Sequence, residues 1–385
     1  MKKTLLTALI LATGVTVMAQ QALRERPDVQ SPVINAQNDV TFKIFAPEAK
    51  NITVIGDFGA SPLAMQRDSI GVWSATISSM EPELYIYRYD IDGVKTADPA
   101  NVYTKRDIST TYSMLFVPGE KTDDYAVHDV PHGTVSRVWY DSPTLGMQRR
   151  MSVYTPAGYE DKKNADKSYP VLYLLHGMGG DEEAWLTLGR TAQILDNLIA
   201  SGQAKPMIVV MPNGNAALPS APGESSAGFT VPTTNLPHTM DGTYENAFTD
   251  IINYIDKTYR TDARKQGRAV AGLSMGGFHS LNISALYPDM FDYVGLFSAA
   301  INPRSNADSP IFKNRDNMLA TQFSNAPKLY WIGIGNEDFL YNDNVAYRKQ
   351  LDSKNYPYTY VESTGGHTWK NWRTYLKLFA PLLFK

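Results

Sequence analysis

Three observations predict an α/β protein built on a doubly wound, mostly parallel sheet, with a small all-β domain before it. Short, nearly continuous apolar runs recur after residue 134 and alternate with amphipathic helical stretches, as in parallel strands covered by helices on both faces. Before residue 126, runs that alternate apolar and polar residues are separated by Pro, Gly and Asp, with no helical period. At 385 residues, two domains are the better expectation.

The composition is that of an ordinary globular protein, with 43% hydrophobic residues, 19% charged residues and a net charge of -3. No basic run or basic excess is present, so we expect no nucleic-acid partner. The sequence contains no cysteine, which excludes disulfides, a lipid-modified cysteine and thiolate metal sites.

The first 19 residues have the pattern of a secretory signal peptide. Two lysines precede an apolar segment from Leu5 to Val17, and Val17-Met18-Ala19 offers a small-x-small cleavage site. The segment is too short and too lightly flanked to serve as a lasting membrane anchor. We therefore expect an exported protein, periplasmic or secreted, that begins at Gln20 and is not held in a membrane after cleavage.

Residues 20–125 are predicted to form an antiparallel β-sandwich of immunoglobulin-like type, because strand-like segments follow one another at short intervals. The stretch 126–133 is expected to be a linker. The expected strands are VTFKIFAP (40–47), NITVIGDF (51–58), GVWSATIS (71–78), LYIYRYDIDG (84–93) and TYSMLFVPG (111–119).

Residues 134–385 are predicted to form the α/β domain. A hairpin is expected first, and helices are expected over 182–200 and 245–259. The hairpin strands are TVSRVWY (134–140) and RRMSVYTP (149–156), and the core strands are PVLYLLHG (170–177), PMIVVMP (206–212), RAVAGLS (268–274), YVGLFSA (293–299) and KLYWIGIG (328–335).

The segment Gly272-Leu273-Ser274-Met275-Gly276 is a G-x-S-x-G motif between an expected strand and an expected helix. In that context the motif is the nucleophile elbow of the α/β-hydrolase fold, where a tight turn exposes the serine hydroxyl and only glycines fit beside it. Ser274 is therefore the predicted nucleophile. The alternative is a glycine-rich turn whose serine caps a helix.

A serine nucleophile needs a histidine base and a carboxylate that orients the base. In this fold the chain order is serine, acid, histidine, and only His279 and His367 follow Ser274. His279 lies within the helix after the elbow and is expected to pack there. His367 lies in a glycine-flanked loop after the last expected strand, so it is the predicted base.

Three carboxylates follow the strand that ends at Gly335. Asp338 is the predicted acid of the triad. Glu337 should point away if Asp338 points in, and Asp343 is expected to cap the helix that follows.

The tetrahedral intermediate of ester hydrolysis needs two backbone N–H groups as an oxyanion hole. By analogy with the fold, these donors are expected at Met178, in the glycine-rich segment LLHGMGGDEEAW (174–185), and at Met275. His176 precedes the serine and ends a buried strand, so we expect it to shape this loop rather than to act as the base.

Residues 213–242 form a long segment without a clear element, which is typical of a binding loop or lid. Phe229, Leu236, His238 and Met240 could line an apolar substrate pocket there. The alternative is a mobile surface loop.

Two resemblances extend these predictions. Residues 38–118, with AMQRDSIGVWSATI and YIYRYDIDGVKTADP, resemble the β-sandwiches of carbohydrate-binding module family 48. The segments LYLLHGMGGDEEAW, AGLSMGGFHSL, WIGIGNEDFLY and GGHTWKNWRTYL resemble, in order and spacing, the bacterial feruloyl esterases of carbohydrate esterase family 1. This second resemblance implies that Ser274, Asp338 and His367 hydrolyse hydroxycinnamate esters on arabinoxylan.

The chemistry itself needs no metal and no organic cofactor. An acetylxylan esterase and a siderophore trilactone esterase remain alternatives on the same fold, and an inactive hydrolase fold that binds glycan is an alternative of another class. The sandwich could bind glycan through Trp73 or Tyr85, or both could be core residues. Since all predicted site residues follow the linker, residues 130–385 are expected to hydrolyse small esters alone.

Overall fold

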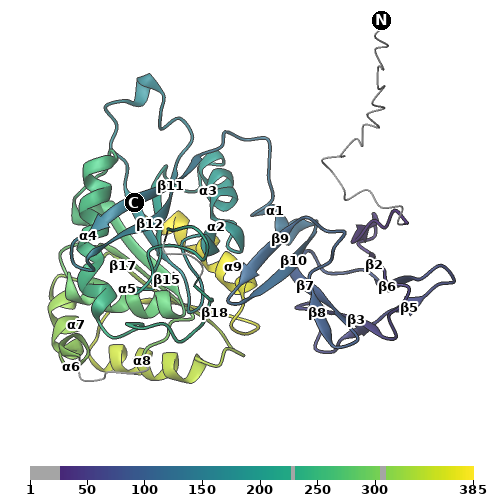
Figure 1. Cartoon of the computed structure of the whole chain (residues 1–385). Helices are drawn as coiled ribbons and strands as arrows, with labels where there is room; N and C mark the ends of the chain where they lie inside the picture. The colour runs from purple at the N-terminus through teal and green to yellow at the C-terminus, as the bar shows by residue number, and fades with distance from the viewer. Residues whose placement is uncertain (1–26, 227–229, 304–308) are drawn as a thin grey trace, which may run out of the picture.

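The computed structural model describes residues 27–226, 230–303 and 309–385. An all-β part at the N-terminal side lies beside a larger part in which helices cover a central sheet (Figure 1). The predicted fold class is therefore confirmed. The predicted signal peptide and Phe229 lie outside the described residues.

Two sheets form the N-terminal sandwich. Their strands alternate buried and partly exposed residues, as in β2, so each sheet turns one apolar face toward the other. One sheet has the order β1 (Val33–Ile34), β2 (Val40–Phe45), β6 (Val72–Ile77), β5 (Gln66–Arg67). The other has β4 (Leu63–Ala64), β3 (Ile52–Gly56), β7 (Glu83–Ile91), β10 (Thr110–Val117), β9 (Thr104–Asp107), with β8 (Val94–Thr96) paired to β7.

Trp73 and Tyr85 are core residues of the sandwich and not exposed glycan contacts. Their exposed fractions are 7% and 9%, and both belong to the hydrophobic core of the sandwich. Trp73 Nε1 donates to Ala46 O at 3.0 Å, and Tyr85 Oη donates to Glu81 O at 3.0 Å. Neither ring forms an exposed platform for a sugar.

The central sheet of the α/β part has eight strands. β12 is antiparallel to both of its neighbours, β11 and β14, and the strands from β14 to the far edge at β18 all run parallel to one another. The order is β11 (Thr134–Ser142), β12 (Met147–Thr155), β14 (Ile208–Pro212), β13 (Val171–Leu175), β15 (Arg268–Leu273), β16 (Tyr293–Phe297), β17 (Leu329–Gly335), β18 (Thr359–Ser363).

The central strands bury both faces, which explains their continuous apolar runs. In β13, Tyr173 packs in the hydrophobic cluster on one face, and Leu172 and Leu174 pack in the cluster on the other. The first face is covered by α4 (Thr243–Thr258), α5 (Met275–Leu286), α7 (Arg315–Ser324) and α8 (Tyr341–Ser353). The second is covered by α3 (Thr191–Ala200) and α9 (Trp369–Phe379).

The helix predicted over 182–200 is divided into α2 (Ala184–Thr187) and α3. A Cβ at Gly189 would lie 2.5 Å from the Trp185 side chain, and Arg190 has a φ of 55° that no helix tolerates. The remaining short helices are α1 (Glu120–Asp123), α6 (Pro310–Lys313) and the 3₁₀ turns η1 (Lys162–Asn164), η2 (Lys265–Gly267) and η3 (Ala380–Leu382). Among the described residues, no helix has the length and apolar character needed to span a bilayer.

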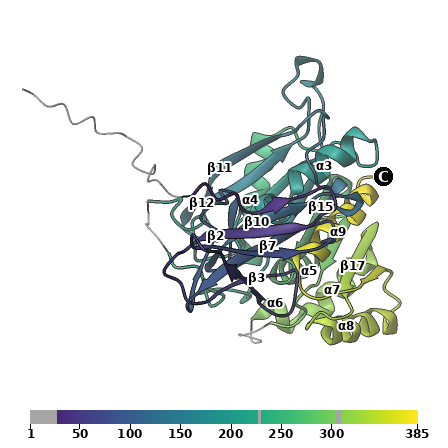
Figure 2. The same cartoon turned by 90° about the vertical axis from the view of Figure 1, so that its right-hand side faces the viewer.

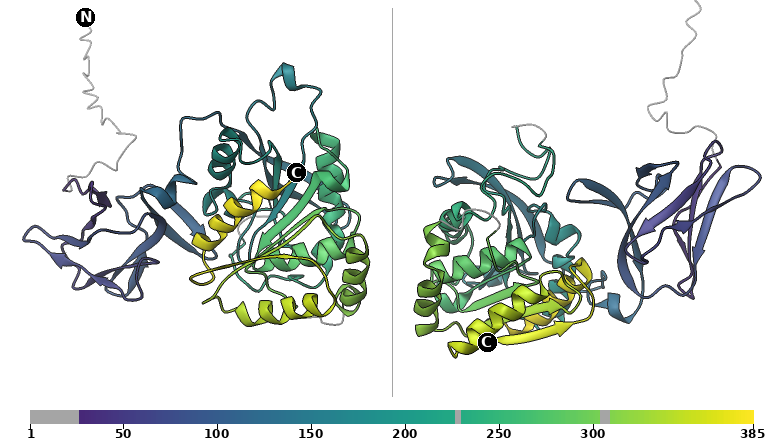
Figure 3. Two further views of the ribbon diagram at one scale, coloured as in Figure 1. Left: turned by 180° about the vertical axis from the view of Figure 1, so that it is seen from behind. Right: turned by 90° about the horizontal axis from the view of Figure 1, so that it is seen from below.

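The sandwich and the α/β part share a buried interface. Viewed from the sandwich side, its strands lie in front of the α/β part (Figure 2), and both views of Figure 3 show the blue strands approaching the yellow C-terminal helix. Leu84 and Met114 of the sandwich belong to the same hydrophobic cluster as α3 and α9. Arg373 of α9 donates to Glu83 Oε1 at 2.7 Å and to Leu84 O at 3.2 Å.

Because Glu83 and Arg373 are both buried, breaking this ion pair should leave a buried charge without a partner in the interface. We expect Glu83→Gln to lower the free energy of unfolding by about 3–5 kcal/mol, measured by urea denaturation. The exposed Glu120→Gln is the matched control and should change it by less than about 0.5 kcal/mol. A loss below about 1 kcal/mol for Glu83→Gln would contradict a firmly packed interface.

Candidate active site

Ser274 lies at the turn between β15 and α5, with φ 53° and ψ -113°. Such a positive φ is strained for a residue other than glycine. The neighbouring glycines are required sterically: a Cβ at Gly272 would lie 2.4 Å from Gly276 C, and one at Gly276 would lie 2.3 Å from Leu175 O. The turn therefore has the tight geometry of a nucleophile elbow.

His367 and Asp338 form an ion-paired couple on neighbouring strand ends. Asp338 follows β17 and His367 follows β18, which pairs with β17 in parallel. His367 Nδ1 lies 3.0 Å from Asp338 Oδ1 and 2.9 Å from Oδ2. Since a carboxylate only accepts, Nδ1 carries the proton and Nε2 is left as the acceptor.

Ser274 and His367 line the same cavity. Within the described part of the chain, no hydrogen bond joins the Ser274 hydroxyl to the His367 ring. Contacts of this kind often tighten only when substrate binds. The structure thus brings the three predicted triad residues to one site, with the acid and the histidine already paired.

Asp338 is held as a carboxylate. Burial alone would raise its pKa, but hydrogen bonding and charge from His367 and the bond from Leu340 N at 2.9 Å outweigh it and lower the pKa below 3.8. Its side chain has an exposed fraction of 0%, compared with 17% for His367. The buried carboxylate holds the His367 ring in place through its Nδ1.

The other two carboxylates of this loop are exposed. Glu337 lies at the surface and borders neither cavity at Ser274. The expectation that Asp343 caps a helix is wrong, because α8 begins at Tyr341 with Leu340 as its N-cap, so Asp343 lies within the first turn. Just before this helix, Asp338 Oδ1 accepts the Leu340 N–H.

The loop after β13 lies against the serine: a Cβ at Gly177 would be 3.3 Å from Ser274 Cβ. Met178 and Met275 both border a cavity of about 270 Å³ that includes Ser274. Met275 is the first residue of α5. The first backbone N–H groups of a helix have no acceptor within the helix and are suited to binding a negative charge. Both predicted oxyanion donors are therefore next to the serine.

Hydrogen bonds of His176 shape this loop. Gly214 N donates to His176 Nε2 at 2.7 Å, so Nδ1 carries the proton and donates to Gly177 O at 2.7 Å. Burial lowers the pKa of His176 to about 4, which keeps the ring neutral. His279 is fully buried in α5 and pairs with Glu245 at 2.7 Å, so it packs within the domain, as expected.

A cavity of about 360 Å³ opens beside Ser274 and His367. Besides the elbow and the loop that carries His367, four segments form its walls: the loop after β13 with α2, residues 221–224, α9, and β9 of the sandwich with the turn that follows it. The lining residues are Lys105, Arg106, Asp107, Ile108, Gly177, Met178, Gly180, Asp181, Glu183, Ala184, Thr187, Leu188, Ala221, Pro222, Glu224, Leu273, Ser274, His367, Trp369 and Trp372.

The predicted pocket residues fare differently. Met240 has an exposed fraction of 1% and packs with Met275 and Phe278, and it borders the smaller cavity at Ser274. Leu236 is half-buried and His238 is exposed, and neither borders a cavity at the serine, so the prediction for these two is not supported. The 213–242 segment contributes Ala221 and Pro222 instead.

No cluster of three or more His, Asp or Glu side chains suited to a metal ion occurs among the described residues.

A strained serine between a strand and a helix, with an Asp–His pair on adjacent strand ends, defines the α/β-hydrolase fold class. The chain belongs to the putative esterase family, whose model matches residues 142–380. Residues 29–106 match carbohydrate-binding module 48, the isoamylase N-terminal domain.

Curated relatives agree with this family. The chain is 31% identical over 365 residues to an endo-1,4-β-xylanase/feruloyl esterase of Xylanibacter ruminicola, covering 94% of this chain and 47% of that protein. It is 28% identical over 279 residues to an esterase of Mycobacterium tuberculosis, covering 61% of this chain and 56% of that protein. The chain thus spans about half the length of these relatives.

Solved structures share the fold. A ferulic acid esterase is 28% identical with a TM-score of 0.52, covering 65% of this chain and 97% of that chain. The enterobactin esterase of Shigella flexneri is 18% identical with a TM-score of 0.63, covering 90% of this chain and 93% of that chain. At that identity the second likeness shows the fold alone, and its coverage extends over the sandwich as well as the α/β part.

Proposed function

We propose that the protein is a serine carboxylic-ester hydrolase that releases hydroxycinnamates, such as ferulate, from feruloylated arabinoxylan or its oligosaccharides. Membership of the esterase family and the Ser274, Asp338, His367 arrangement support the reaction class. The likeness to proteins described as feruloyl esterases supports the acyl group. The module 48 match supports a carbohydrate on the alcohol side.

The proposed reaction proceeds through an acyl-enzyme. His367 Nε2 takes the proton of Ser274 as Oγ bonds to the ester carbonyl carbon, and the Met178 and Met275 N–H groups bind the oxyanion. The bond from that carbon to the sugar oxygen then breaks, and His367 gives the proton to the leaving alcohol. Water repeats the sequence: its proton goes to His367, its oxygen bonds to the acyl carbon, and Ser274 is released and reprotonated. Asp338 holds the ring throughout.

The cavity beside Ser274 is the observation that favours an aromatic acyl group. Its volume of about 360 Å³ is within the range of small-molecule sites and leaves room for a ring, which an acetyl group would not need. Trp369 and Trp372 form part of its wall, with ring centroids 5.1 Å apart. Indole rings favour stacked or edge-on contacts with a substrate ring.

Side-by-side kinetics on methyl ferulate, p-nitrophenyl acetate and a catecholate trilactone test this substrate class. We expect the largest kcat/KM for methyl ferulate. A clear preference for the acetyl ester would favour an acetylxylan esterase, and a preference for the trilactone would favour a siderophore esterase.

We expect Trp369→Ala to raise KM for methyl ferulate about tenfold, because the ring loses one aromatic wall. The KM for p-nitrophenyl acetate should change by less than about threefold, since an acetyl group does not reach that wall. Trp139→Ala removes an exposed tryptophan of β11 that does not border this cavity, and it is the matched control. Equal effects of Trp369→Ala on both esters would count against an acyl pocket at this wall.

The proposed mechanism uses no metal ion or organic cofactor. We expect hydrolysis of methyl ferulate to be unchanged after dialysis against excess EDTA, with untreated enzyme as the control. Loss of activity that added divalent cations restore would contradict a metal-free reaction.

We also propose that the protein is exported, with residues 1–19 as the signal peptide. The lysine pair followed by the apolar segment Leu5–Val17 supports this. Mass spectrometry of the protein made by its own cells should find Gln20 as the first residue. An intact N-terminus would contradict cleavage.

A further inference from the structure

The hairpin of β9 and β10 brings the sandwich into the active site. Residues 105–108, at the end of β9 and its turn, line the same cavity as Ser274 and His367. Among the described residues, β10 is the only strand that pairs with β9, so the other edge of β9 is unpaired. One wall of the proposed substrate cavity is thus supplied by a different domain from the triad.

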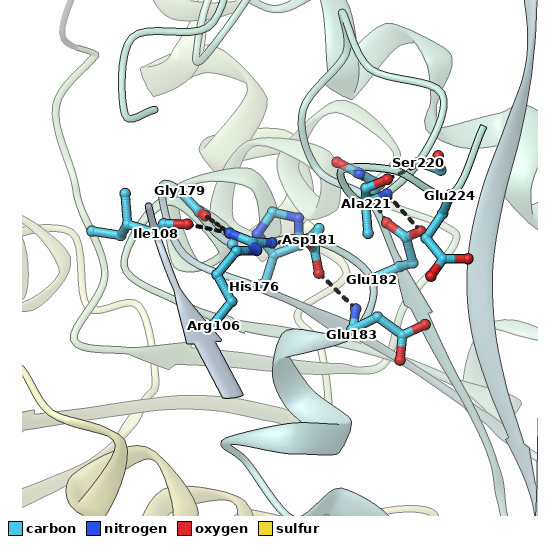
Figure 4. Close-up of polar contacts among 12 residues, drawn as sticks. Arg106, Ile108, His176, Gly179, Asp181, Glu182, Glu183, Ser220, Ala221 and Glu224 are labelled. Atoms are coloured by element: carbon cyan, nitrogen blue, oxygen red, sulfur yellow. Dashed lines mark hydrogen bonds and ion pairs between the residues drawn. The ribbon is translucent and has the colours of Figure 1, made fainter. Parts of the chain in front are cut away.

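Arg106 is the main polar contact of this hairpin with the catalytic domain (Figure 4). Its Nη2 forms an ion pair with Asp181 Oδ2, and its Nη1 donates to Gly179 O at 3.4 Å and to Ile108 O in its own turn. The Asp181 side chain is 5% exposed and that of Arg106 is 28% exposed. A buried carboxylate is thereby matched with a cation from the sandwich.

Two contacts of the hairpin, from Arg106 and from Ile108, are made with Gly179, the residue after Met178. Gly179 has a φ of 79°, and a Cβ there would lie 2.7 Å from the Ile108 side chain, so only glycine allows the hairpin to approach. The Arg106 bond to Gly179 O and the Ile108 contact therefore fix the backbone at Gly179, one residue after the one that carries the Met178 N–H.

The rest of the loop is held from within the catalytic domain. Asn215 Nδ2 donates to Gly180 O at 2.9 Å, and Glu183 N donates to Asp181 Oδ1 at 3.0 Å. Together with the His176 bonds, these contacts anchor both flanks of the segment from Gly177 to Glu183. On the side of this segment that faces the sandwich, Arg106 makes the contacts with Gly179 and Asp181.

We propose that Arg106 is a positioning residue for ester hydrolysis: through Asp181 and Gly179 O, the sandwich holds the Met178 N–H at the oxyanion. This inference rests on the hydrolase function proposed above. The module 48-like domain is then part of the catalytic unit, and the expectation that residues 130–385 act alone does not fit these contacts.

The size of the effect follows from oxyanion-hole chemistry. A donor must lie about 2.7–3.1 Å from the developing oxyanion, and removing one donor costs about 10²- to 10³-fold in kcat. Loosening the loop displaces the donor without removing it. Arg106→Ala should therefore lower kcat by about tenfold or more, with a smaller change in KM, because the interaction counts most in the transition state.

The test is steady-state kinetics of the full chain on p-nitrophenyl acetate, whose small acyl group does not need the hairpin wall. We expect Arg106→Ala to lose about tenfold in kcat with KM changed less than about threefold, and Arg106→Lys to recover part of kcat because it keeps a cation opposite Asp181. Arg67→Ala, an exposed arginine of β5 in the other sheet, is the control and should match wild type.

Asp181→Asn breaks the same ion pair from the other domain. It should also lower kcat, and the double variant with Arg106→Ala should lose no more than the more severe single variant. If Arg106→Ala fails to fold, Asp181→Asn and Arg106→Lys carry the test. A kcat within twofold of wild type for Arg106→Ala or Asp181→Asn, or equal losses in Arg67→Ala, would overturn the inference while leaving the hydrolase intact. An inactive wild type would instead refute the proposed function.

Discussion

Replacing Ser274 with alanine is expected to lower kcat for ester hydrolysis by about 10⁴- to 10⁶-fold while the protein remains folded. The elbow presents this one hydroxyl to the cavity that also contains His367, so its loss removes the attacking atom. Alanine has the same Cβ as serine and meets the same backbone geometry at φ 53°, so the turn should keep its shape.

Steady-state assays with methyl ferulate and a thermal unfolding curve measure both parts of this prediction. Ser284→Ala is the matched control: Ser284 lies in α5, the helix that follows Ser274, and is buried with its hydroxyl bonded to Leu281 O. It should keep kcat within about threefold. Activity of Ser274→Ala within tenfold of wild type would mean that another residue attacks the ester.

Replacing Asp338 with asparagine is expected to lower kcat by about 10⁴-fold. The amide cannot stabilise the positive imidazolium, and its NH₂ group favours the tautomer of His367 that carries the proton on Nε2. In that tautomer the ring cannot accept the proton of Ser274. The Asp338–His367 distances of 2.9 and 3.0 Å make this coupling direct.

Glu337→Gln and Asp343→Asn separate the role of the acid from its location. All three carboxylates lie within a few residues, but only Asp338 is buried. We expect both controls to keep kcat within about threefold. If one of them were the inactive variant and Asp338→Asn stayed active, the acid would be misassigned, although Ser274 and His367 would stand.

The triad could be predicted from sequence because its signals are local or ordered along the chain. The elbow depends on five consecutive residues whose glycines have one steric purpose. His367 followed from chain order, and Asp338 from its place just after a strand. The strand pattern was readable because buried parallel strands are continuously apolar.

The wall supplied by β9 could not be predicted in the same way. Its residues, Thr104–Asp107, are polar and show no alternation, because their contacts are made with another domain. Arg106 and Asp181 are 75 residues apart in the chain, and nothing local links them. The linker at 126–133 suggested independence of the domains, whereas the buried Glu83–Arg373 pair joins them.

The residues of the 213–242 segment that line the cavity could not be predicted from the sequence either. The sequence predicts large apolar residues such as Leu236 as the pocket lining, but the cavity is lined by Ala221 and Pro222 of this segment. Small residues are placed there by backbone contacts, such as the bond from Ala221 N to Glu182 Oε1 at 2.8 Å. Side-chain chemistry alone does not reveal such positions.

Covalent labelling with diethyl p-nitrophenyl phosphate tests the central assignment most directly, because the reagent traps an activated serine as a stable phosphoryl ester. One equivalent should inactivate the enzyme, and peptide mass spectrometry should find the diethylphosphoryl group on Ser274. Asp338→Asn should react far more slowly than wild type. An adduct on another residue that abolishes activity, or full hydrolysis of methyl ferulate after Ser274 is labelled, would contradict the assignment of Ser274 as the nucleophile.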